Sequence, residues 1–351
     1  MSFSESINLS DKKDYLVGVN YFSGWWRQRP NKYAVIGHRD WRCDFPERIA
    51  LLGCYNDQET MDAEIVAASE YGIDYFLILF YVETPERHPH GKRLNAGLRQ
   101  FLASPENNRM SFAIEFCNHP PFEILDDQIW HACCDEWVDA MKHPSYLRIG
   151  GKGFFKVHGL DLFITQNNNN IQKVAKRLDI LREKAEKAGI GPLIIGAGSM
   201  AQQVPAKNML NYLELFDFLA TYMDVPDLPL SENDYPYEML MDFAEKGWMN
   251  YASNSYLPYI PYVPAGWNPR PWGDIRPSFK FPDEIQWANC LYKVKEALDK
   301  YPKLRIPDGT SEGQKMLNIY AWNEFGEGGI VAPAVGDGWM KLEKIKEVFN
   351  R

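Results

Sequence analysis

The sequence predicts an α/β fold, a single (β/α)8 TIM barrel with long aromatic loops after its strands. Short apolar runs alternate with amphipathic helical patterns along all 351 residues and give eight strand-then-helix units. No linker-like break separates these units, so we expect one barrel domain over residues 1–351. A doubly wound open sheet is the alternative, and it is weakened because no G-x-G-x-x-G follows the first expected strand.

The expected strands are short and rich in apolar residues. The second, Ile73 to Tyr81, is almost continuously apolar, as is typical of a strand covered on both faces. The seventh, Tyr256 to Val263, is interrupted by Pro258 and Pro261. The others are expected at residues 15–22, 110–117, 153–158, 193–198, 218–223 and in the first half of 316–333.

Helices are predicted where apolar residues recur at helical spacing. Asn56, followed by Glu59, is the expected start of the first helix. The run of asparagines from Asn167 to Asn170 predicts a solvated turn. Further helices are expected to end near residue 102 and to cover residues 126–142, 171–185, 210–215, 237–246, 282–300 and 340–349.

Composition excludes several classes of function. The net charge is −9 without a basic cluster, which argues against nucleic acid and anionic membranes as partners. No apolar run reaches about eighteen residues, so no membrane span is expected. The six cysteines form no C-x-x-C pair, and a disulfide framework is not expected. The first residues lack a signal-peptide pattern, which leaves the localisation open.

The chain is rich in aromatic residues, with 11 Trp, 19 Tyr and 19 Phe. Many stand beside Pro and Gly in expected loops, where their flat faces could stack on sugar rings. The alternative is that they fill the core of a large barrel. In a barrel, function lies at the carboxyl ends of the strands. The residues expected there are polar and aromatic without a metal-like cluster, so no metal or cofactor is expected: Asn20, Tyr21, Tyr81, Glu115, Asn118, His158, Ser199, Tyr222, Asp224, Tyr262, Asn323, Glu324 and Glu327.

The strongest chemical signal follows the eighth strand. Glu324 and Glu327 stand three residues apart in a glycine-rich turn after Trp322 and Asn323. Glycosidic bond cleavage needs an acid that protonates the departing oxygen. It also needs a carboxylate that activates water, attacks the sugar carbon or deprotonates a substrate hydroxyl, and one such pair supplies both. The alternative is a surface turn with two solvated acids; the flanking residues and the buried strand favour catalysis. Glu115 is either a third active-site acid or the partner of a neighbouring Arg or Lys.

Other chemistries lack their motifs. The sequence has no H-E-x-x-H, no G-x-S-x-G and no G-x-x-x-x-G-K-[ST], and its seven histidines are scattered. These absences leave the glutamate pair as the main catalytic candidate.

Four segments resemble glycoside hydrolase family 99 and, more closely, its WbsX-like relatives. They occur in the family's order along nearly the whole chain: Tyr71-Gly-Ile-Asp-Tyr-Phe, Gly91-Lys-Arg-Leu, Gly266-Trp-Asn-Pro-Arg and Ala321-Trp-Asn-Glu-Phe-Gly-Glu-Gly. The last is the most specific. Two departures are Phe116-Cys-Asn-His, where relatives carry Trp-Ala-Asn-Glu and only Asn118 matches, and Phe325, where Trp or Tyr is common.

The resemblance implies a metal-free barrel acting on α-linked mannose or a similar sugar with retention of configuration. It implies that Glu324 is the base on the sugar's 2-hydroxyl, which gives a 1,2-anhydro intermediate, and that Glu327 protonates the leaving group and then activates water. The expected contacts with an oligo- or polysaccharide are Tyr21, Trp25, Tyr81, Glu115, Asn118, Tyr222, Trp267, Asn268, Arg270, Trp322 and Asn323.

Three functions therefore remain. The first is a retaining α-glycosidase, the second is a glycan-assembly transferase or transglycosylase using the same site, and the third is a non-catalytic carbohydrate-binding barrel. The presence of both acids favours the first over the third.

Overall fold

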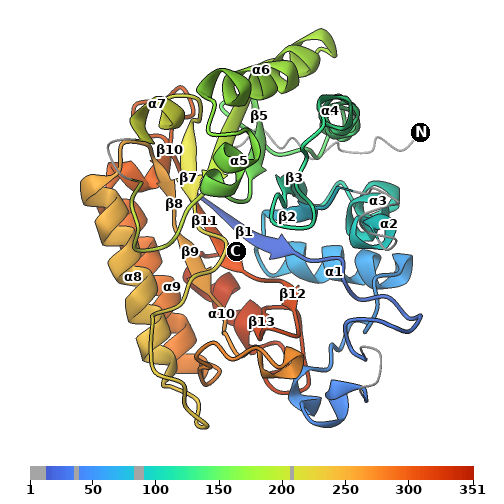
Figure 1. Ribbon diagram of the computed structural model, residues 1–351. Helices are drawn as coiled ribbons and strands as arrows, with labels where there is room; N and C mark the ends of the chain where they lie inside the picture. The colour runs from blue at the N-terminus through green and yellow to red at the C-terminus, as the bar shows by residue number, and fades with distance from the viewer. Residues whose placement is uncertain (1–12, 35–38, 83–90, 206–208) are drawn as a thin grey trace, which may run out of the picture.

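The computed structural model describes residues 13–34, 39–82, 91–205 and 209–351. A ring of parallel strands lies inside a layer of helices (Figure 1). The strands of the ring are β1 (Tyr15–Tyr21), β2 (Tyr75–Phe80), β3 (Ser111–Phe116), β5 (Lys152–Val157), β6 (Leu193–Gly198), β7 (Phe218–Ala220), β8 (Tyr259–Ile260), β9 (Tyr262–Pro264) and β11 (Gln314–Tyr320). Neighbouring strands from β1 to β8 pair in parallel, β9 pairs in parallel with β11, and β11 pairs with β1, which confirms the predicted (β/α)8 barrel.

The seventh barrel strand is divided at Pro261, as its sequence predicted. Its first part, β8, pairs with β7, and its second part, β9, pairs with β11. Proline has no N–H to donate to a ladder, so the pairing is interrupted at this residue. The sheet is therefore nearly closed, with two short segments in the place of one strand.

The helices alternate with the strands around the ring. In Figure 1, α8 and α9 cover one side of the barrel, and α1, α3 and α4 cover the other. Their bounds are α1 (Gln58–Glu70), α2 (Gly91–Leu94), α3 (Ala96–Ala103), α4 (Asp127–Met141), α5 (Leu160–Gln166), α6 (Ile171–Lys187), α7 (Leu210–Leu213), α8 (Tyr237–Asn254), α9 (Glu284–Lys300) and α10 (Met340–Val348). Within the described residues, none is long and apolar enough to cross a membrane.

Three local predictions need correction. The cap of α1 is Asp57, whose carboxylate accepts a hydrogen bond from the backbone N–H of Thr60, and not Asn56. Asn167 is buried and Asn170 caps α6, so the asparagine run is not simply a solvated turn. α8 continues to Asn254, eight residues past its expected end. Most of the expected polar loop 83–93 lies outside the described residues.

Side chains alternate between the two faces of the barrel strands. Tyr75 and Leu77 of β2 point into the barrel interior with Phe154, Phe218 and Met316. The alternate residues of the same strands pack against the helices. Polar side chains of the inward set gather near the carboxyl ends of the strands, where they form the floor beneath the loops: Asn20, Glu115, Lys156 and Asn318.

Candidate active site

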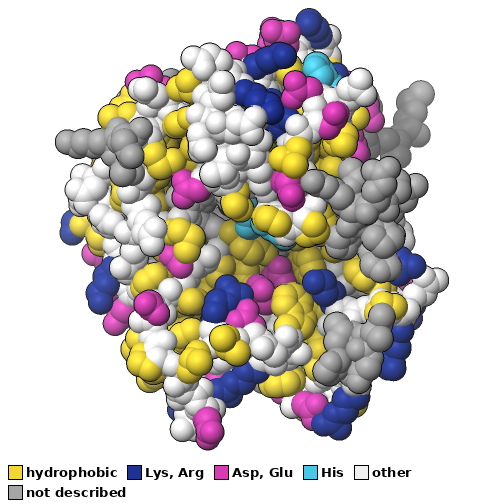
Figure 2. Space-filling model, in the orientation of Figure 1, with side chains coloured by type: hydrophobic (Ala, Val, Ile, Leu, Met, Phe, Trp, Pro, Cys, Tyr) yellow, Lys and Arg dark blue, Asp and Glu magenta, His cyan; other side chains and the backbone are white. Residues whose placement is uncertain are grey.

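A cavity of about 650 Å³ lies at the carboxyl ends of the strands. Figure 2 shows this face hollowed near its centre, where hydrophobic, acidic, basic and histidine side chains gather. Six residues expected at the site or the barrel mouth line the cavity: Tyr81, His158, Tyr222, Trp267, Glu324 and Glu327. Most of the other lining residues come from loops, among them Phe22, Trp26, Lys32, His119, Phe122, Trp272 and Arg276.

The two glutamates occupy the ends of one tight turn. The turn joins β12 (Asn323–Glu324) to β13 (Gly329–Ile330), and the Glu327 N–H donates to the Glu324 carbonyl at 3.1 Å. Residues i and i+3 of a β-turn lie within about 7 Å of each other at Cα. The three-residue spacing therefore brings both carboxylates to one side of the cavity. Gly328, at φ +83°, adopts the left-handed conformation that continues the hairpin.

Glu324 is the more deeply buried of the pair, at 4% exposure. The Tyr222 hydroxyl donates to its Oε1 at 2.6 Å, while Oε2 has no hydrogen-bond partner among the described residues. Burial raises the pKa of Glu324 well above its usual range, and the negative charge of Glu327 raises it further. A protonated Glu324 is therefore favoured at neutral pH.

Glu327 faces a more polar part of the cavity, with 18% of its side chain exposed. Burial also raises the pKa of this carboxyl, while a hydrogen bond from the Tyr320 hydroxyl and the charge of Arg276 act in the opposite direction. Arg276 Nη2 lies 3.9 Å from Glu327 Oε1. Two interacting buried carboxyls of this kind hold one proton between them over a wide pH range.

A buried arginine supports the glutamate turn from behind. Arg48 Nη1 donates to the carbonyl oxygens of Asn268 at 2.8 Å and Phe325 at 3.3 Å. Burial lowers the pKa of Arg48 to about 10, which leaves it charged at neutral pH. On the other side, a Cβ on Gly326 would lie 2.2 Å from the Trp272 ring, so only glycine fits there. The turn is therefore held between Arg48 and Trp272.

Glu115 is a partner of buried cations beneath the cavity and does not line it. Its carboxylate accepts hydrogen bonds from Lys156 Nζ at 2.8 Å and Asn20 Nδ2 at 3.1 Å, and it lies 2.7 Å from His158 Nδ1. Of the two interpretations of Glu115, the geometry matches the pairing with a neighbouring Arg or Lys, which is Lys156. His158 extends the network to the cavity, where its ring lies 4.8 Å from that of Tyr222.

Three expected sugar contacts are buried and do not line the cavity. Tyr21 is fully buried and donates to Glu64 at 2.7 Å. Trp25 packs among Tyr33, Trp41 and Phe325. Trp322 is fully buried and packs against Phe76. Their direct contact with a sugar would require the wall to open.

Four further expected contacts join loops to one another. Asn118 exchanges two hydrogen bonds with the backbone of Gly159, and Asn323 does the same with Phe22. Asn268 donates to Asp234, and Arg270 pairs with the same carboxylate at 3.0 Å. These side chains hold the rim of the cavity in shape; Arg270 also lines a neighbouring cavity.

The sequence did not reveal the residues whose charges or hydrogen bonds shift the pKa values of the two glutamates. Lys32 and Arg276 come from separate loops far from the pair along the chain, and no local pattern marks them. Tyr320 could have been found, because strand alternation places it inside the barrel with Met316 and Asn318. Within the described parts of the chain, no group of three or more His, Cys, Asp or Glu side chains could hold a metal ion.

No protein-family model and no curated protein matches the chain. Among solved structures it is similar to a glycoside hydrolase-like protein at 15% identity and a TM-score of 0.61, covering 99% of this chain and 97% of that one. It is also similar to the family 99 endo-α-mannosidase of Bacteroides thetaiotaomicron, at 16% identity and a TM-score of 0.55, with 97% and 98% covered. An exo-β-1,4-mannosidase of Opitutaceae bacterium strain TAV5 matches at 10% identity and a TM-score of 0.53, with 100% of this chain and 62% of that chain covered.

The TM-scores, over nearly the whole of this chain, show a shared fold. The resemblance to family 99 that the motifs predicted is therefore present in the fold of the whole chain. The closer likeness to WbsX-like proteins stays a prediction.

Proposed function

We propose that the protein is a glycoside hydrolase that cleaves α-linked glycans with Glu324 and Glu327 as its acid–base pair. The observation that carries the proposal is the placement of two interacting carboxyls in one cavity. Each of them accepts a hydrogen bond from a tyrosine hydroxyl. Such a pair retains one proton near neutral pH, so an acid and a carboxylate are present together. The fold shared with glycoside hydrolases supports the same conclusion.

The cavity also has the surfaces that sugars require. The rings of Trp267, Trp272 and Tyr81 line it, and flat aromatic faces stack on the apolar faces of pyranose rings. Arg276 and His158 supply polar groups at its wall. This mixture of aromatic walls and a few polar groups is typical of a ligand cavity.

The motif resemblance supports an α-linked substrate and retention of configuration. Fold alone does not choose between anomers, because the similar structures include an α-mannosidase and a β-mannosidase. In the proposed first step Glu324 removes the proton of the 2-hydroxyl, O2 attacks the anomeric carbon, and Glu327 gives its proton to the departing oxygen. In the second step Glu327 takes a proton from water, the water oxygen opens the 1,2-anhydro ring, and Glu324 returns its proton to O2.

This division of roles requires the shared proton to lie on Glu327 when substrate is bound. Without substrate contacts, burial favours Glu324 as the residue that carries this proton. The Tyr222 hydrogen bond stabilises the ionised form of Glu324 and so assists the transfer. The opposite division, with Glu324 as the acid, is distinguished by the dependence of Glu324→Gln and Glu327→Gln on the leaving group.

The proposal is tested by incubating the protein with α-mannans and α-glucans and following the products by NMR. We expect hydrolysis of at least one glycan, with the first-formed hemiacetal in the α configuration. A β-configured first product would contradict retention. Transfer of the glycosyl group to an added sugar without hydrolysis would indicate the glycan-assembly enzyme. Saturable binding of a glycan with no turnover anywhere in the panel would indicate the carbohydrate-binding barrel.

A further inference from the structure

A second cavity of about 660 Å³ adjoins the catalytic one. The two share Lys32 and Trp272, which line both. The second cavity is otherwise rich in aromatic side chains, among them Tyr33, Trp41 and Phe45. Its size and rings suit one or two further sugar residues of a chain bound at the glutamate pair.

Lys32 lies at the junction of these cavities. Its ammonium lies 4.7 Å from the ring centre of Trp272 and 5.7 Å from that of Phe22. Among the described residues, none forms a hydrogen bond or an ion pair with this ammonium, although its charge lowers the pKa of Glu324 and Glu327. An ammonium carries three N–H donors, and all three are open to a ligand.

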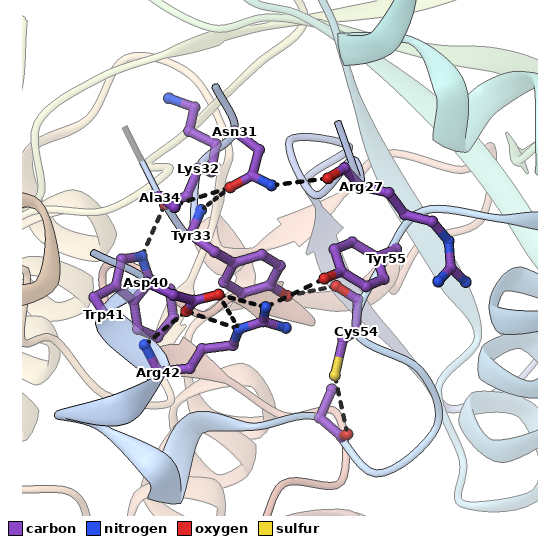
Figure 3. Close-up of polar contacts among 11 residues, drawn as sticks. Arg27, Asn31, Lys32, Tyr33, Ala34, Asp40, Trp41, Arg42, Cys54 and Tyr55 are labelled. Atoms are coloured by element: carbon purple, nitrogen blue, oxygen red, sulfur yellow. Dashed lines mark hydrogen bonds and ion pairs between the residues drawn. The ribbon is translucent and has the colours of Figure 1, made fainter. Parts of the chain in front are cut away.

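The loop that carries Lys32 is firmly held. The indole N–H of Trp41 donates to the Lys32 carbonyl at 2.8 Å, and the Asn31 side chain accepts from the backbone N–H of Ala34 at 2.8 Å. Asp40 and Arg42 form two further hydrogen bonds beneath the loop, at 3.0 and 2.6 Å. Figure 3 shows the Lys32 side chain pointing away from this cluster. The backbone from which the Lys32 side chain extends is therefore held in place by these contacts.

The other cations of the second cavity are already neutralised. Arg39 forms an ion pair with Asp44, and Arg270 pairs with Asp234 at 3.0 Å. Lys32 is left as the open positive charge, in a chain with a net charge of −9. A single cation between aromatic rings is a means of recognising a sugar that carries a negative group.

We propose that the second cavity binds an anionic sugar residue of the substrate, with Lys32 contacting its acidic group and Trp272 its ring. The inference rests on the proposed function, because it names the class of glycan that the hydrolase cleaves. The acidic group is the carboxylate of a uronic acid or an ester sulfate, which share a compact negative charge.

The test is calorimetric binding of matched oligosaccharides to the whole protein. One set contains uronic-acid oligosaccharides and their carboxyl-reduced forms, and the other contains sulfated oligosaccharides and their desulfated forms. We expect at least one acidic member to bind about tenfold more tightly than its neutral match, which corresponds to ~1.4 kcal/mol. The set in which the preference appears identifies the acidic group. Added salt should reduce the difference in affinity between the acidic and neutral members.

Lys32→Met removes the charge and keeps most of the stem, so the ratio of the affinities for the acidic and neutral members of a set should fall to about one. Lys32→Arg, which restores a positive charge, should restore the preference. Lys246→Met on the exposed face of α8 is the matched control and should behave as wild type. Denaturation curves of all three variants establish that each is folded.

Two results would overturn the inference: equal affinity for the acidic and neutral members of both sets, or an undiminished preference in folded Lys32→Met. Its failure is separate from that of the proposed function. Cleavage of neutral glycans without any acid preference would leave the hydrolase in place. Tight binding of acidic glycans that are never cleaved would support the anionic subsite and contradict the proposal that the protein is a hydrolase.

Discussion

The hydroxyl of Tyr222 donates a 2.6 Å hydrogen bond to Oε1 of Glu324, the more deeply buried carboxyl of the pair. Tyr222 continues the inward alternation of β7, and Glu324 begins the turn after β11. The contact thus joins the sixth and eighth strands of the ring, on either side of β8 and β9, through the cavity. It also stabilises the charged form of a carboxyl that burial would keep neutral.

Replacement of Tyr222 by Phe should lower kcat while the protein stays folded. The variant loses a hydrogen bond to an ionised group, which is worth about 1.5–3 kcal/mol, so we expect a fall of roughly 10- to 100-fold. Steady-state kinetics on the substrate found in the NMR panel measure the effect. Tyr212→Phe, whose hydroxyl bonds the Asn169 carbonyl at the surface, is the matched control. Wild-type kcat in Tyr222→Phe would show that the contact has no catalytic part.

The pH profile of kcat/KM should have a basic limb near pH 8. Burial and the charge of Glu327 raise the pKa of Glu324 to about 8, and above this pH the pair loses its shared proton. Tyr222→Phe should move this limb to higher pH, because the lost hydrogen bond favoured the ionised form. A rate that stays constant from pH 7 to pH 10 would contradict the one-proton pair.

Replacement of Glu115 by Gln should destabilise the fold by about 3–5 kcal/mol, because it leaves the buried Lys156 ammonium without its counter-ion. Burial alone would raise the pKa of Glu115, but the charges and hydrogen bonds of Lys156 and His158 lower it to about 2. The unfolded value is about 4.3. The stabilisation is therefore present above pH ~4.3 and is lost as the pH falls towards 2.

Urea denaturation at pH 7 and pH 3 tests this prediction. The difference between wild type and Glu115→Gln should shrink at the lower pH. The double variant Glu115→Gln/Lys156→Met should lose less stability than the single one, because it leaves no unpaired charge. A pH-independent difference would mean that the ion pair is not its source.

Replacement of Glu64 by Gln should stabilise the fold at neutral and basic pH, whereas Glu115→Gln destabilises it. Burial raises the pKa of Glu64 to about 7, so the folded state binds a proton that the unfolded state, with a pKa of about 4.3, has released. Wild-type stability should fall between pH ~4 and ~7 and change little from this source above it. The glutamine side chain of the variant would avoid that loss and keep an acceptor for the Tyr21 hydroxyl.

We expect Glu64→Gln to match wild type at pH 4 and to exceed its unfolding free energy by about 3 kcal/mol at pH 8. Denaturant titrations at both pH values measure the difference. A variant less stable than wild type at pH 8 would show that Glu64 is ionised and well solvated in the fold.

The barrel itself was predictable because buried parallel strands are apolar on both faces and alternate with amphipathic helices. The E-x-x-E pair was predictable because its spacing matches the ends of one turn. Strand alternation could have gone further. Tyr21 shares its face with Val17 and Val19, which pack against the helices, whereas Tyr222 follows Phe218 into the barrel. Two tyrosines at equivalent strand ends therefore have different surroundings.

The rest of the site depends on loop conformations that no periodicity encodes. Asn118 and Asn323 have the polarity of sugar-binding residues, yet their amides bond the backbone of neighbouring loops. Lys32 and Trp272 meet across 240 residues of chain, and neither stands in a motif. Such pairings are set by the packing of long loops against each other.

The central claim is that Glu324 and Glu327 are the acid–base pair, and the leaving-group dependence of their glutamine variants tests it most directly. Aryl α-glycosides of the sugar that wild type hydrolyses would be used, with good and poor leaving groups. We predict that Glu327→Gln loses about 10²–10⁴-fold in kcat/KM with poor leaving groups and far less with good ones. Glu324→Gln should lose activity equally with both. Reversal of the two patterns would exchange the roles, and wild-type kcat/KM in both folded variants would contradict the account.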